Sequence, residues 1–293
     1  MGGFCCFIFE FVLLCLLGEI MNKIKLIGID LDGTALNSRK ELTVKNIEAF
    51  NECRKRGIHI VPVTGRPYSG VYDEYKSGMK CDYTINTNGA AVMEVKSGKR
   101  VISHTMSPDK ALEVMKAVKD FNCYYGVFHD GYGYLTPERL SFELEKYKNT
   151  PLHKYILSTR KPVKNQAEFI KRAGSCDNIY VIAENEKVRN EIRAAIKDIN
   201  AIFFTSSAHD DVEIGGNCSK GKALLELADY LGIEKSGVMA IGDSGNDVEM
   251  LKHAGISVAM DNADDAVKRV CDYVTASCED SGVASAIEKF VLC

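Results

Sequence analysis

The feature that most constrains this chain is a short apolar run that ends at two acidic residues. Residues 26–29 (Leu-Ile-Gly-Ile) predict a strand buried on both faces, as in a parallel sheet covered by helices. The next residues are Asp30-Leu31-Asp32-Gly33-Thr34. Because an open parallel sheet binds its ligands at the carboxyl ends of its strands, this acidic segment is a candidate functional site.

Asp30 and Asp32 would point into the same crevice if the backbone stays extended, because side chains two residues apart in a strand leave on the same side. At about 4 Å and an effective dielectric of about 20, their repulsion is on the order of 4 kcal/mol. They must therefore share a proton, bind a cation or face water. The plainer alternative is an acidic turn, in which Gly33 supplies a positive φ and Thr34 caps the next segment.

Helical and apolar segments then alternate, which indicates consecutive βαβ units. A helix is expected after Thr43, with Val44, Ile47 and Phe50 at helical spacing and Gly57 at its end.

Two further buried strands are expected at residues 58–63 and 83–86. The first ends in Thr64-Gly65-Arg66-Pro67 and the second in Thr87-Asn88-Gly89-Ala90. A threonine hydroxyl and an arginine can donate hydrogen bonds to an anion, so the first turn is a candidate anion site. The arginine and the asparagine could equally be ordinary turn residues.

Between residues 89 and 210 the pattern changes to that of an α+β insert with its own core. Helices are expected to start at Ser107-Pro108 and Thr136-Pro137, and residues 123–135 predict a hairpin around His129-Asp130-Gly131. Further elements are expected as a strand at 179–183, a helix at 188–199 and a strand at 201–205.

The earlier alternation resumes near residue 211. Val212-Glu213-Ile214 leads into a helix that starts at Lys220. A buried strand at residues 238–241 then ends in Gly242-Asp243-Ser244-Gly245-Asn246-Asp247, whose last aspartate is expected to cap the next helix. The sequence thus predicts an α/β protein with a discontinuous core, residues 22–88 and 211–293, interrupted by the insert.

Residues 1–21 are an apolar extension outside this core. The run from Phe4 to Leu17 resembles the apolar part of a signal peptide, but no Lys or Arg precedes it and no small-residue cleavage site follows. It is also too short to span a bilayer, and Cys6 does not fit a myristoylation motif. We expect a dispensable extension before a domain that begins near Met21, with a membrane anchor or a signal peptide as alternatives.

Composition excludes several classes of function. The net charge is -3, and the Lys and Arg residues are scattered rather than gathered in a stripe, so no nucleic-acid partner is expected. The 11 cysteines form no C-x-x-C pair, and the six histidines show no metal-ligand spacing. We expect a cytoplasmic protein with reduced thiols, no membrane partner, and a monomeric or weakly dimeric state.

Four motifs in order resemble one known family. They are D-x-D-G-T at residues 30–34, T-G-R at 64–66, S-K-G at 219–221 and G-D-S-G-N-D at 242–247, with a large insert between the second and third. This chain resembles the haloacid dehalogenase superfamily of phosphotransferases, specifically its Cof-type branch. The resemblance covers residues 22–293 and implies a Rossmann-like parallel-sheet core with an inserted α+β cap.

The resemblance also implies a magnesium-dependent phosphatase. The ion would be held by the carboxylates of Asp30 and Asp243 and the backbone carbonyl of Asp32, with Asp247 behind them. Oxygen-only ligands with room for water suit Mg²⁺. By the same resemblance, Asp30 would be the nucleophile that forms an aspartyl-phosphate, and Asp32 the general acid and then the base.

Three other residues are implied as phosphate ligands. Thr64 and Lys220 would hold the phosphoryl oxygens, and Asn246 would contact the phosphate or Lys220. Lys220 also stands out without the resemblance, because the first turn of a helix is an unfavourable place for a cation.

Other functions remain open. The sequence from Gly216 to Lys222 matches the spacing of a nucleotide-binding P-loop, but Ala223 replaces the hydroxyl residue that binds Mg²⁺. A receiver domain would not need so large an insert. A sugar-phosphate sensor without turnover, and a phosphomutase, would keep the same residues. Sugar phosphates are the expected substrates, ahead of pyridoxal phosphate or a nucleotide-related ester, with His129, Asp130 and Tyr132 as specificity candidates.

Overall fold

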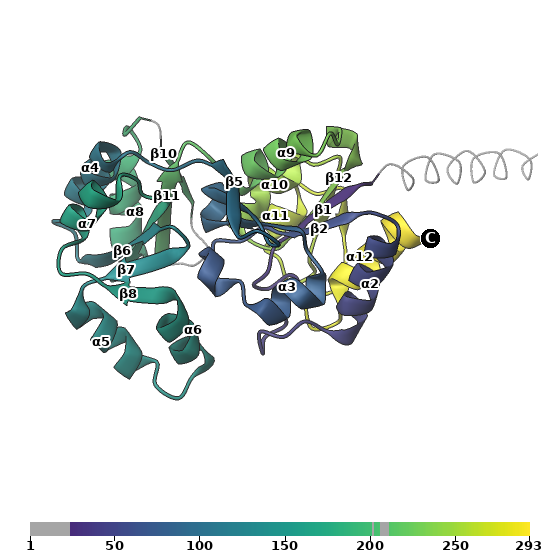
Figure 1. Cartoon of the computed structure of the whole chain (residues 1–293), viewed down its shortest axis with the longest axis horizontal. Helices are drawn as coiled ribbons and strands as arrows, with labels where there is room; N and C mark the ends of the chain where they lie inside the picture. The colour runs from purple at the N-terminus through teal and green to yellow at the C-terminus, as the bar shows by residue number, and fades with distance from the viewer. Residues whose placement is uncertain (1–23, 201, 206–210) are drawn as a thin grey trace, which may run out of the picture.

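The computed structural model describes residues 24–200, 202–205 and 211–293. The expected extension at residues 1–21 lies outside this part of the chain. Figure 1 shows two bodies side by side, and the chain leaves the first after β5 (Lys99–Ser103) and returns to it before α9 (Lys220–Tyr230). The expected fold, an α/β core with a parallel sheet and an inserted α+β unit, is confirmed. In the described residues, no helix combines the length and apolar character that a membrane crossing requires.

The core is built on a five-stranded parallel sheet. Its strands are β1 (Leu26–Ile29), β2 (His59–Pro62), β12 (Val238–Gly242), β13 (Ile256–Ala259) and β14 (Tyr273–Val274), in the order β14-β13-β12-β1-β2. β1 lies between β12 and β2, with Ile29 paired to Ile241 on one side and to Pro62 on the other. The residues that follow these three strands are therefore neighbours at one edge of the sheet.

Helices cover both faces of this sheet (Figure 1). They are α2 (Val44–Lys55), α3 (Asp73–Met79), α9 (Lys220–Tyr230), α10 (Val248–His253), α11 (Asp265–Lys268) and α12 (Gly282–Ile287), with short turns at η1 (Tyr68–Gly70), η2 (Thr87–Gly89), η3 (Lys235–Gly237), η4 (Gly245–Asp247) and a closing π-helical turn, η5 (Glu288–Leu292). The side chains of β1 alternate between two cores. Ile27 and Ile29 pack toward α2 and α12, whereas Leu26 packs toward α9 and α10. At Gly28 a β-carbon would lie 2.6 Å from Leu224 Cδ2, so the missing side chain lets α9 lie close against β1.

The third predicted strand is not part of the parallel sheet, which corrects the sequence-based expectation. β3 (Tyr83–Asn86) pairs antiparallel with β4 (Ala91–Glu94), which pairs with β5 (Lys99–Ser103); one parallel bridge, Val63 to Ile85, joins β3 to the core. The reason is η2, where Asn88 (φ 54°) and Gly89 (φ 100°) reverse the chain directly after β3.

The cap, which we define as residues 106–216, holds a six-stranded sheet in the order β10-β11-β9-β6-β7-β8. Its strands are β6 (Cys123–His129), β7 (Tyr132–Leu135), β8 (Arg160–Pro162), β9 (Asn178–Ala183), β10 (Ile202–Thr205) and β11 (Asp211–Gly216). Its helices are α4 (Pro108–Val118), α5 (Pro137–Lys146), α6 (Pro151–Thr159), α7 (Gln166–Ala173) and α8 (Glu186–Ile196). Figure 1 shows α4, α7 and α8 on one side of this sheet and α5 and α6 on the other.

The boundaries expected at residues 89 and 210 do not match the packing. Val92 on β4 is buried with the core helix α9, so β4 and β5 belong with the core. Val212 and Ile214 are buried in the cap, because β11 pairs antiparallel with β9 and β10. The apolar alternation around residue 213 predicts a strand, but it does not show which other strands this strand pairs with.

Helix caps and turns were predicted more reliably than the pairing of strands. Thr43, Ser107 and Thr136 cap their helices as expected, and the hairpin turn lies at Asp130-Gly131. Val44 was expected on the apolar face of the helix that follows Thr43, but it is 71% exposed. The helices α6 and α7 were not predicted.

Candidate active site

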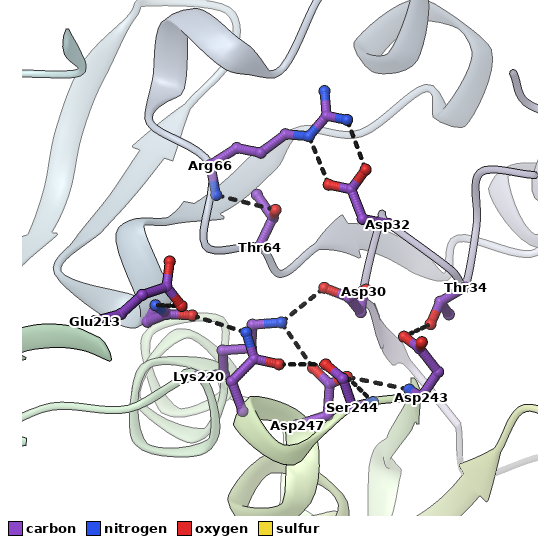
Figure 2. Close-up of polar contacts among 12 residues, drawn as sticks. Asp30, Asp32, Thr34, Thr64, Arg66, Glu213, Lys220, Asp243, Ser244 and Asp247 are labelled. Carbon is purple, nitrogen blue, oxygen red and sulfur yellow. Dashed lines mark hydrogen bonds and ion pairs between the residues drawn. The ribbon is translucent and has the colours of Figure 1, made fainter. Parts of the chain in front are cut away.

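Three carboxylates and one lysine meet at the carboxyl ends of β1 and β12. Asp30 follows β1, Asp243 follows β12, and the Asp30 backbone N–H donates to the Ile241 carbonyl at 3.0 Å. Lys220, the first residue of α9, reaches both Asp30 Oδ1 (2.6 Å) and Asp247 Oδ1 (2.7 Å) with its Nζ. Figure 2 shows both contacts of Lys220. The convergence expected from the sequence is therefore observed.

This cluster has the chemistry of a divalent cation site. One oxygen from each of Asp30, Asp243 and Asp247 lies within 4.8 Å of the others. Burial raises the pKa of Asp30 well above its ordinary value; Lys220 opposes this, whereas the charges of Asp247 and Asp243 add to it. Burial and the charge of Asp247 also raise the pKa of Asp243 to about 6. A hard cation with oxygen ligands, such as Mg²⁺, would relieve this repulsion.

The backbone fixes Asp243 and Asp247 in these positions. Asp247 Oδ2 accepts hydrogen bonds from the backbone N–H groups of Asp243 (3.1 Å) and Ser244 (3.0 Å). Asp247 is the N-cap residue of α10, as predicted, but its side chain makes no capping hydrogen bond to that helix and instead forms a capping box with Ser244 at η4. Thr34 Oγ1 donates to Asp243 Oδ1 at 2.9 Å. Gly33 has φ +86°, and a β-carbon there would lie 2.5 Å from Asp243 Oδ2, so this turn requires glycine.

Asp32 is turned away from Asp30, contrary to the expectation for an extended segment. Its carboxylate accepts from Arg66 Nε and Nη2, both at 2.7 Å (Figure 2), and from Lys40 Nζ at 2.8 Å. The chain turns directly after β1, because the Asp30 carbonyl accepts from the Ala35 N–H, so the alternation of a strand does not apply. Burial would raise the pKa of Asp32, but the hydrogen bonds and charges of Arg66 and Lys40 hold it well below its usual range.

Thr64 and Arg66 lie at the end of β2, as the strand exit predicts. The Thr64 hydroxyl accepts from the Arg66 backbone N–H at 3.1 Å, and Thr64 is 2% exposed. The Arg66 guanidinium lies 5.5 Å from the ring of Tyr75 and 5.3 Å from that of Tyr155, which belongs to the cap helix α6. The sequence left the role of Arg66 open, whereas the structure places it between Asp32 and the cap.

The hydrogen bonds of Asn246 go to Ser244 and Asn88 rather than to Lys220. Its Nδ2 donates to Asn88 Oδ1 (3.3 Å), and its Oδ1 accepts from Ser244 Oγ (2.7 Å). Asn88 Nδ2 in turn donates to Glu213 Oε2 at 2.9 Å. Burial and the charge of Asp211 raise the pKa of Glu213 to about 7. This network connects the cap strand β11 to the core loop that carries Asn246.

Sequence reasoning did not single out Glu213. The signal was present as alternation: Val212 and Ile214 face the apolar cap core, so residues 211 and 213 face the opposite side of the sheet. That face also carries Tyr124, Phe128, Tyr180 and Ile182 from β6 and β9, in matching register.

A cavity of about 460 Å³ lies between this face of the cap sheet and the acidic cluster. Its core-side lining includes Asp30, Asp32, Thr64, Arg66 and Asp243. Its cap-side lining includes Tyr124, Phe128, Glu143, Tyr155, Arg160, Tyr180 and Glu213. The volume suits a small ligand.

The predicted specificity residues do not line this cavity. The tip of the β6–β7 hairpin rests on the core instead, where the Gly131 carbonyl accepts from the backbone N–H (3.1 Å) and the hydroxyl (2.6 Å) of Ser69. His129 Nδ1 lies 3.3 Å from Ser175 Oγ, and the ring of Tyr132 lies under Lys161 Nζ at 3.3 Å. Asp130 lies 4.0 Å from Arg100, so the hairpin tip serves as a contact between cap and core.

Comparisons with known proteins agree on one family. The model of haloacid dehalogenase-like hydrolases matches residues 27–287. The putative phosphatase YxeH of Bacillus subtilis is 31% identical over 283 residues, which cover 92% of this chain and 98% of that protein. YcsE of the same organism, a 5-amino-6-(5-phospho-D-ribitylamino)uracil phosphatase, is 26% identical over 270 residues, with 92% and 96% coverage. A solved haloacid dehalogenase-like hydrolase from B. subtilis has a TM-score of 0.79 and 27% identity, covering 90% of this chain and 99% of that one.

Proposed function

The chain belongs to the haloacid dehalogenase-like hydrolases, and we propose that it is a Mg²⁺-dependent phosphatase that hydrolyses small phosphorylated metabolites. The observation that carries this proposal is the meeting of Asp30, Asp243 and Asp247 with Lys220 beside the cavity between core and cap. An anionic phosphate entering a group of carboxylates needs a cation and a lysine to offset the charge, and this chain supplies residues for both.

The residues that would hold the cation are Asp30, Asp243 and the backbone carbonyl of Asp32, with Asp247 behind them. A bound Mg²⁺ would supply charge neutralisation and orientation of the phosphoryl group. Asp247 serves this arrangement by accepting the backbone N–H groups that shape the loop around Asp243. Its other oxygen holds the ammonium of Lys220.

Asp30 is the proposed nucleophile. One of its carboxylate oxygens forms a bond to phosphorus as the bond from phosphorus to the ester oxygen breaks, which leaves an aspartyl-phosphate. Lys220 is positioned to bind the phosphoryl oxygens because its Nζ already lies 2.6 Å from Asp30. The Thr64 hydroxyl lines the same cavity and is proposed to donate to a second phosphoryl oxygen.

Asp32 is the proposed general acid, which protonates the leaving oxygen and later takes a proton from the attacking water. In the structure both of its oxygens are held by Arg66. The acid role therefore requires Arg66 to release at least one oxygen, which then takes up a proton from solvent before it protonates the leaving group. A phosphate dianion that competes for the same guanidinium would favour this release. Arg66 is accordingly proposed as the residue that positions Asp32, and Asn246 as a residue that shapes the phosphate pocket.

Sugar phosphates are the first proposed substrates. The cavity of about 460 Å³ is large enough for a phosphorylated sugar, and its polar lining offers acceptors for hydroxyl groups. The name of the relative YcsE specifies a substrate with a phosphorylated ribityl chain, which has the same kind of hydroxyl groups. Pyridoxal phosphate and nucleotide-related esters rank behind. The protein is proposed to act in the cytoplasm as a monomer or weak homodimer.

The test is phosphate release from p-nitrophenyl phosphate by the full chain, with and without Mg²⁺. Steady release that EDTA abolishes and Mg²⁺ restores is expected, with loss in Asp30→Asn. Lys222→Ala is the matched control, because Lys222 is exposed and contacts the Asn217 carbonyl rather than the acidic cluster. Loss in Lys222→Ala together with retention in Lys220→Ala would instead favour nucleotide binding by the P-loop-like segment.

Two alternatives on the same scaffold give different products. A sensor would bind sugar phosphates in calorimetry without releasing phosphate from any of them. A phosphomutase would transfer the phosphoryl group to a second position of the sugar, so that phosphorus NMR would detect a new ester and little free phosphate. A panel of phosphorylated metabolites assayed in both ways would separate these outcomes and rank the substrates.

A further inference from the structure

Arg160 differs from other largely enclosed arginines of this protein. Arg66, Arg100 and Arg139 have side chains no more than 20% exposed, and each is paired with a carboxylate. Arg160 lines the cavity from the cap strand β8, and its Nε is fully buried. Among the described residues no carboxylate forms an ion pair with it, and its recorded hydrogen bond runs from Nη1 to Thr159 Oγ1 at 3.0 Å.

Aromatic rings surround this guanidinium. Its central carbon lies 4.8 Å from the ring centre of Phe128, 5.3 Å from that of Tyr155 and 5.2 Å from that of Tyr180. Two polar atoms in this cluster, Arg160 Nε and the hydroxyl of Tyr180, have no hydrogen-bond partner in the described part of the chain. Tyr180 is 9% exposed, so its hydroxyl is not simply solvated.

The cap sheet is shaped to hold these two side chains. Gly133 pairs with Arg160 across β7 and β8, and a β-carbon at this glycine would lie 2.7 Å from Arg160 Cδ. Gly126 pairs with Tyr180 across β6 and β9, and a β-carbon there would lie 2.3 Å from Tyr180 Cε1. The neighbouring strands β6 and β7 therefore each have a glycine at the position where a side chain would collide with Tyr180 or Arg160.

The aromatic rings offset only part of the cost of enclosing a guanidinium. A cation over a ring face is stabilised, but less than by a carboxylate that accepts its N–H groups. A charge removed from water without a charged partner is strongly destabilising. The remaining donors of Arg160 therefore favour an oxyanion in the adjoining cavity.

The other charged residues that line the cavity do not supply a partner for Arg160. Asp32 is paired with Arg66, and Glu143 Oε1 accepts from Arg139 Nε at 3.1 Å. Glu213 is held by Asn88. Asp30 is paired with Lys220. The acids around the cavity thus already have partners of their own, whereas Arg160 does not.

We propose that Arg160 is an anion subsite for the leaving group, so that the preferred substrates are phosphate monoesters with a second oxyanion, a carboxylate or a second phosphate. This inference rests on the proposed phosphatase function and narrows its substrate class. The phosphoryl group would lie at Asp30 and Lys220, on the core side of the cavity. The second oxyanion would accept the N–H groups of Arg160 on the cap side, next to the Tyr180 hydroxyl.

The experiment compares matched substrate pairs that differ in the second anion. The carboxylate arm is 3-phosphoglycerate against glycerol 3-phosphate, and the phosphate arm is fructose 1,6-bisphosphate against fructose 6-phosphate. The readout is the ratio of kcat/KM within each pair, measured with Mg²⁺ for the full chain. We expect kcat/KM to be about tenfold or more higher for the member with the second oxyanion in at least one pair. This factor corresponds to the free energy of one hydrogen bond to a charged group.

Arg160→Gln is expected to reduce that ratio to near unity, and Arg160→Lys to restore part of it. Arg172→Gln is the matched control, because Arg172 is exposed on α7 of the same cap and should keep the ratio. Gly133→Ala provides a second route, since it displaces the Arg160 stem without changing its charge, and should also lower the ratio. Because the ratio compares two substrates of the same variant, it stays informative when a variant keeps only part of its activity.

The proposal would be overturned if the unmodified protein shows no preference, in either pair, for the member that carries the second oxyanion. An unchanged ratio in Arg160→Gln would also overturn it. Release of phosphate from p-nitrophenyl phosphate separates these failures from a failure of the proposed function. If that release is present and the ratio does not depend on Arg160, the anion subsite is wrong and the phosphatase stands. If no phosphate ester is hydrolysed, both are wrong.

Discussion

The guanidinium of Arg66 holds both carboxylate oxygens of Asp32, through Nε and Nη2 at 2.7 Å each. This fork fixes the direction of the proposed general acid and keeps it ionised until substrate arrives. Because Arg66 also lies against Tyr155 of the cap, the position of the acid depends on a contact between the two bodies.

Arg66→Gln is expected to lower kcat by roughly 10- to 100-fold for an alkyl ester such as glucose 6-phosphate, since Asp32 loses its orientation. p-Nitrophenyl phosphate should be affected less, because its leaving group needs little protonation. Arg54→Gln is the control, as it removes an arginine–aspartate ion pair, with Asp82, at the surface. Equal losses for both substrates would show that Arg66 acts on phosphate binding and not on the acid.

Lys220→Met should both inactivate and destabilise the protein. The change leaves Asp30 and Asp247 buried beside each other without their cation, which costs about 3–5 kcal/mol of unfolding free energy. Urea denaturation measures this loss, and Lys222→Met, on the exposed side of α9, should be close to neutral. If the two variants unfold at the same urea concentration, Lys220 does not compensate the acidic cluster.

Mg²⁺ should raise the thermal stability of the unmodified protein, because it binds the folded acidic cluster and not the unfolded chain. Asp243→Asn removes one of three crowded carboxylates, so the metal-free variant should be more stable by about 1 kcal/mol. The same variant should lose most of the stabilisation by Mg²⁺. Differential scanning fluorimetry with Asp229→Asn as an exposed control tests both changes, and a full Mg²⁺ response in Asp243→Asn would exclude this ligand.

Glu213 should make stability depend on pH. Its pKa is raised by burial to about 7 in the folded protein, above the value of an unfolded glutamate, so its contribution is fully present below the unfolded value and is lost as pH rises through about 7. Between about pH 5 and pH 8 this loss is on the order of 2 kcal/mol. Glu213→Gln should remove it in urea titrations at the two pH values, whereas Glu184→Gln, at an exposed position, should not. An unchanged pH dependence in Glu213→Gln would place the titrating group elsewhere.

The catalytic half of the site was accessible from the sequence because it depends on local order. Asp30, Thr64 and Asp243 each follow a buried strand, and parallel strands place their carboxyl ends at one edge. Lys220 was recognisable because a helix start disfavours a cation unless an anion lies nearby. The contacts of Asp30 and Asp247 with Lys220 agree with that reasoning.

The substrate half was not accessible in the same way. Arg160, Tyr180 and Glu213 come from three strands of the cap sheet, and they are brought together only by the pairing of segments that are distant in the sequence, parallel for β7 with β8 and antiparallel for β6, β9 and β11. The hairpin residues His129, Asp130 and Tyr132 were the specificity candidates, but that turn docks on the core.

By itself the sequence determined the alternation of buried strands and helices, the insert, and the acidic exits of β1 and β12, because short-range apolar pattern, capping residues and turn glycines are written in consecutive positions. Only the tertiary structure decided that Asp32 turns to Arg66, that β11 belongs to the cap, and that Arg160 stands without a carboxylate partner in the described chain. These facts depend on which residues that are distant in the sequence come into contact. A local sequence pattern does not determine such contacts.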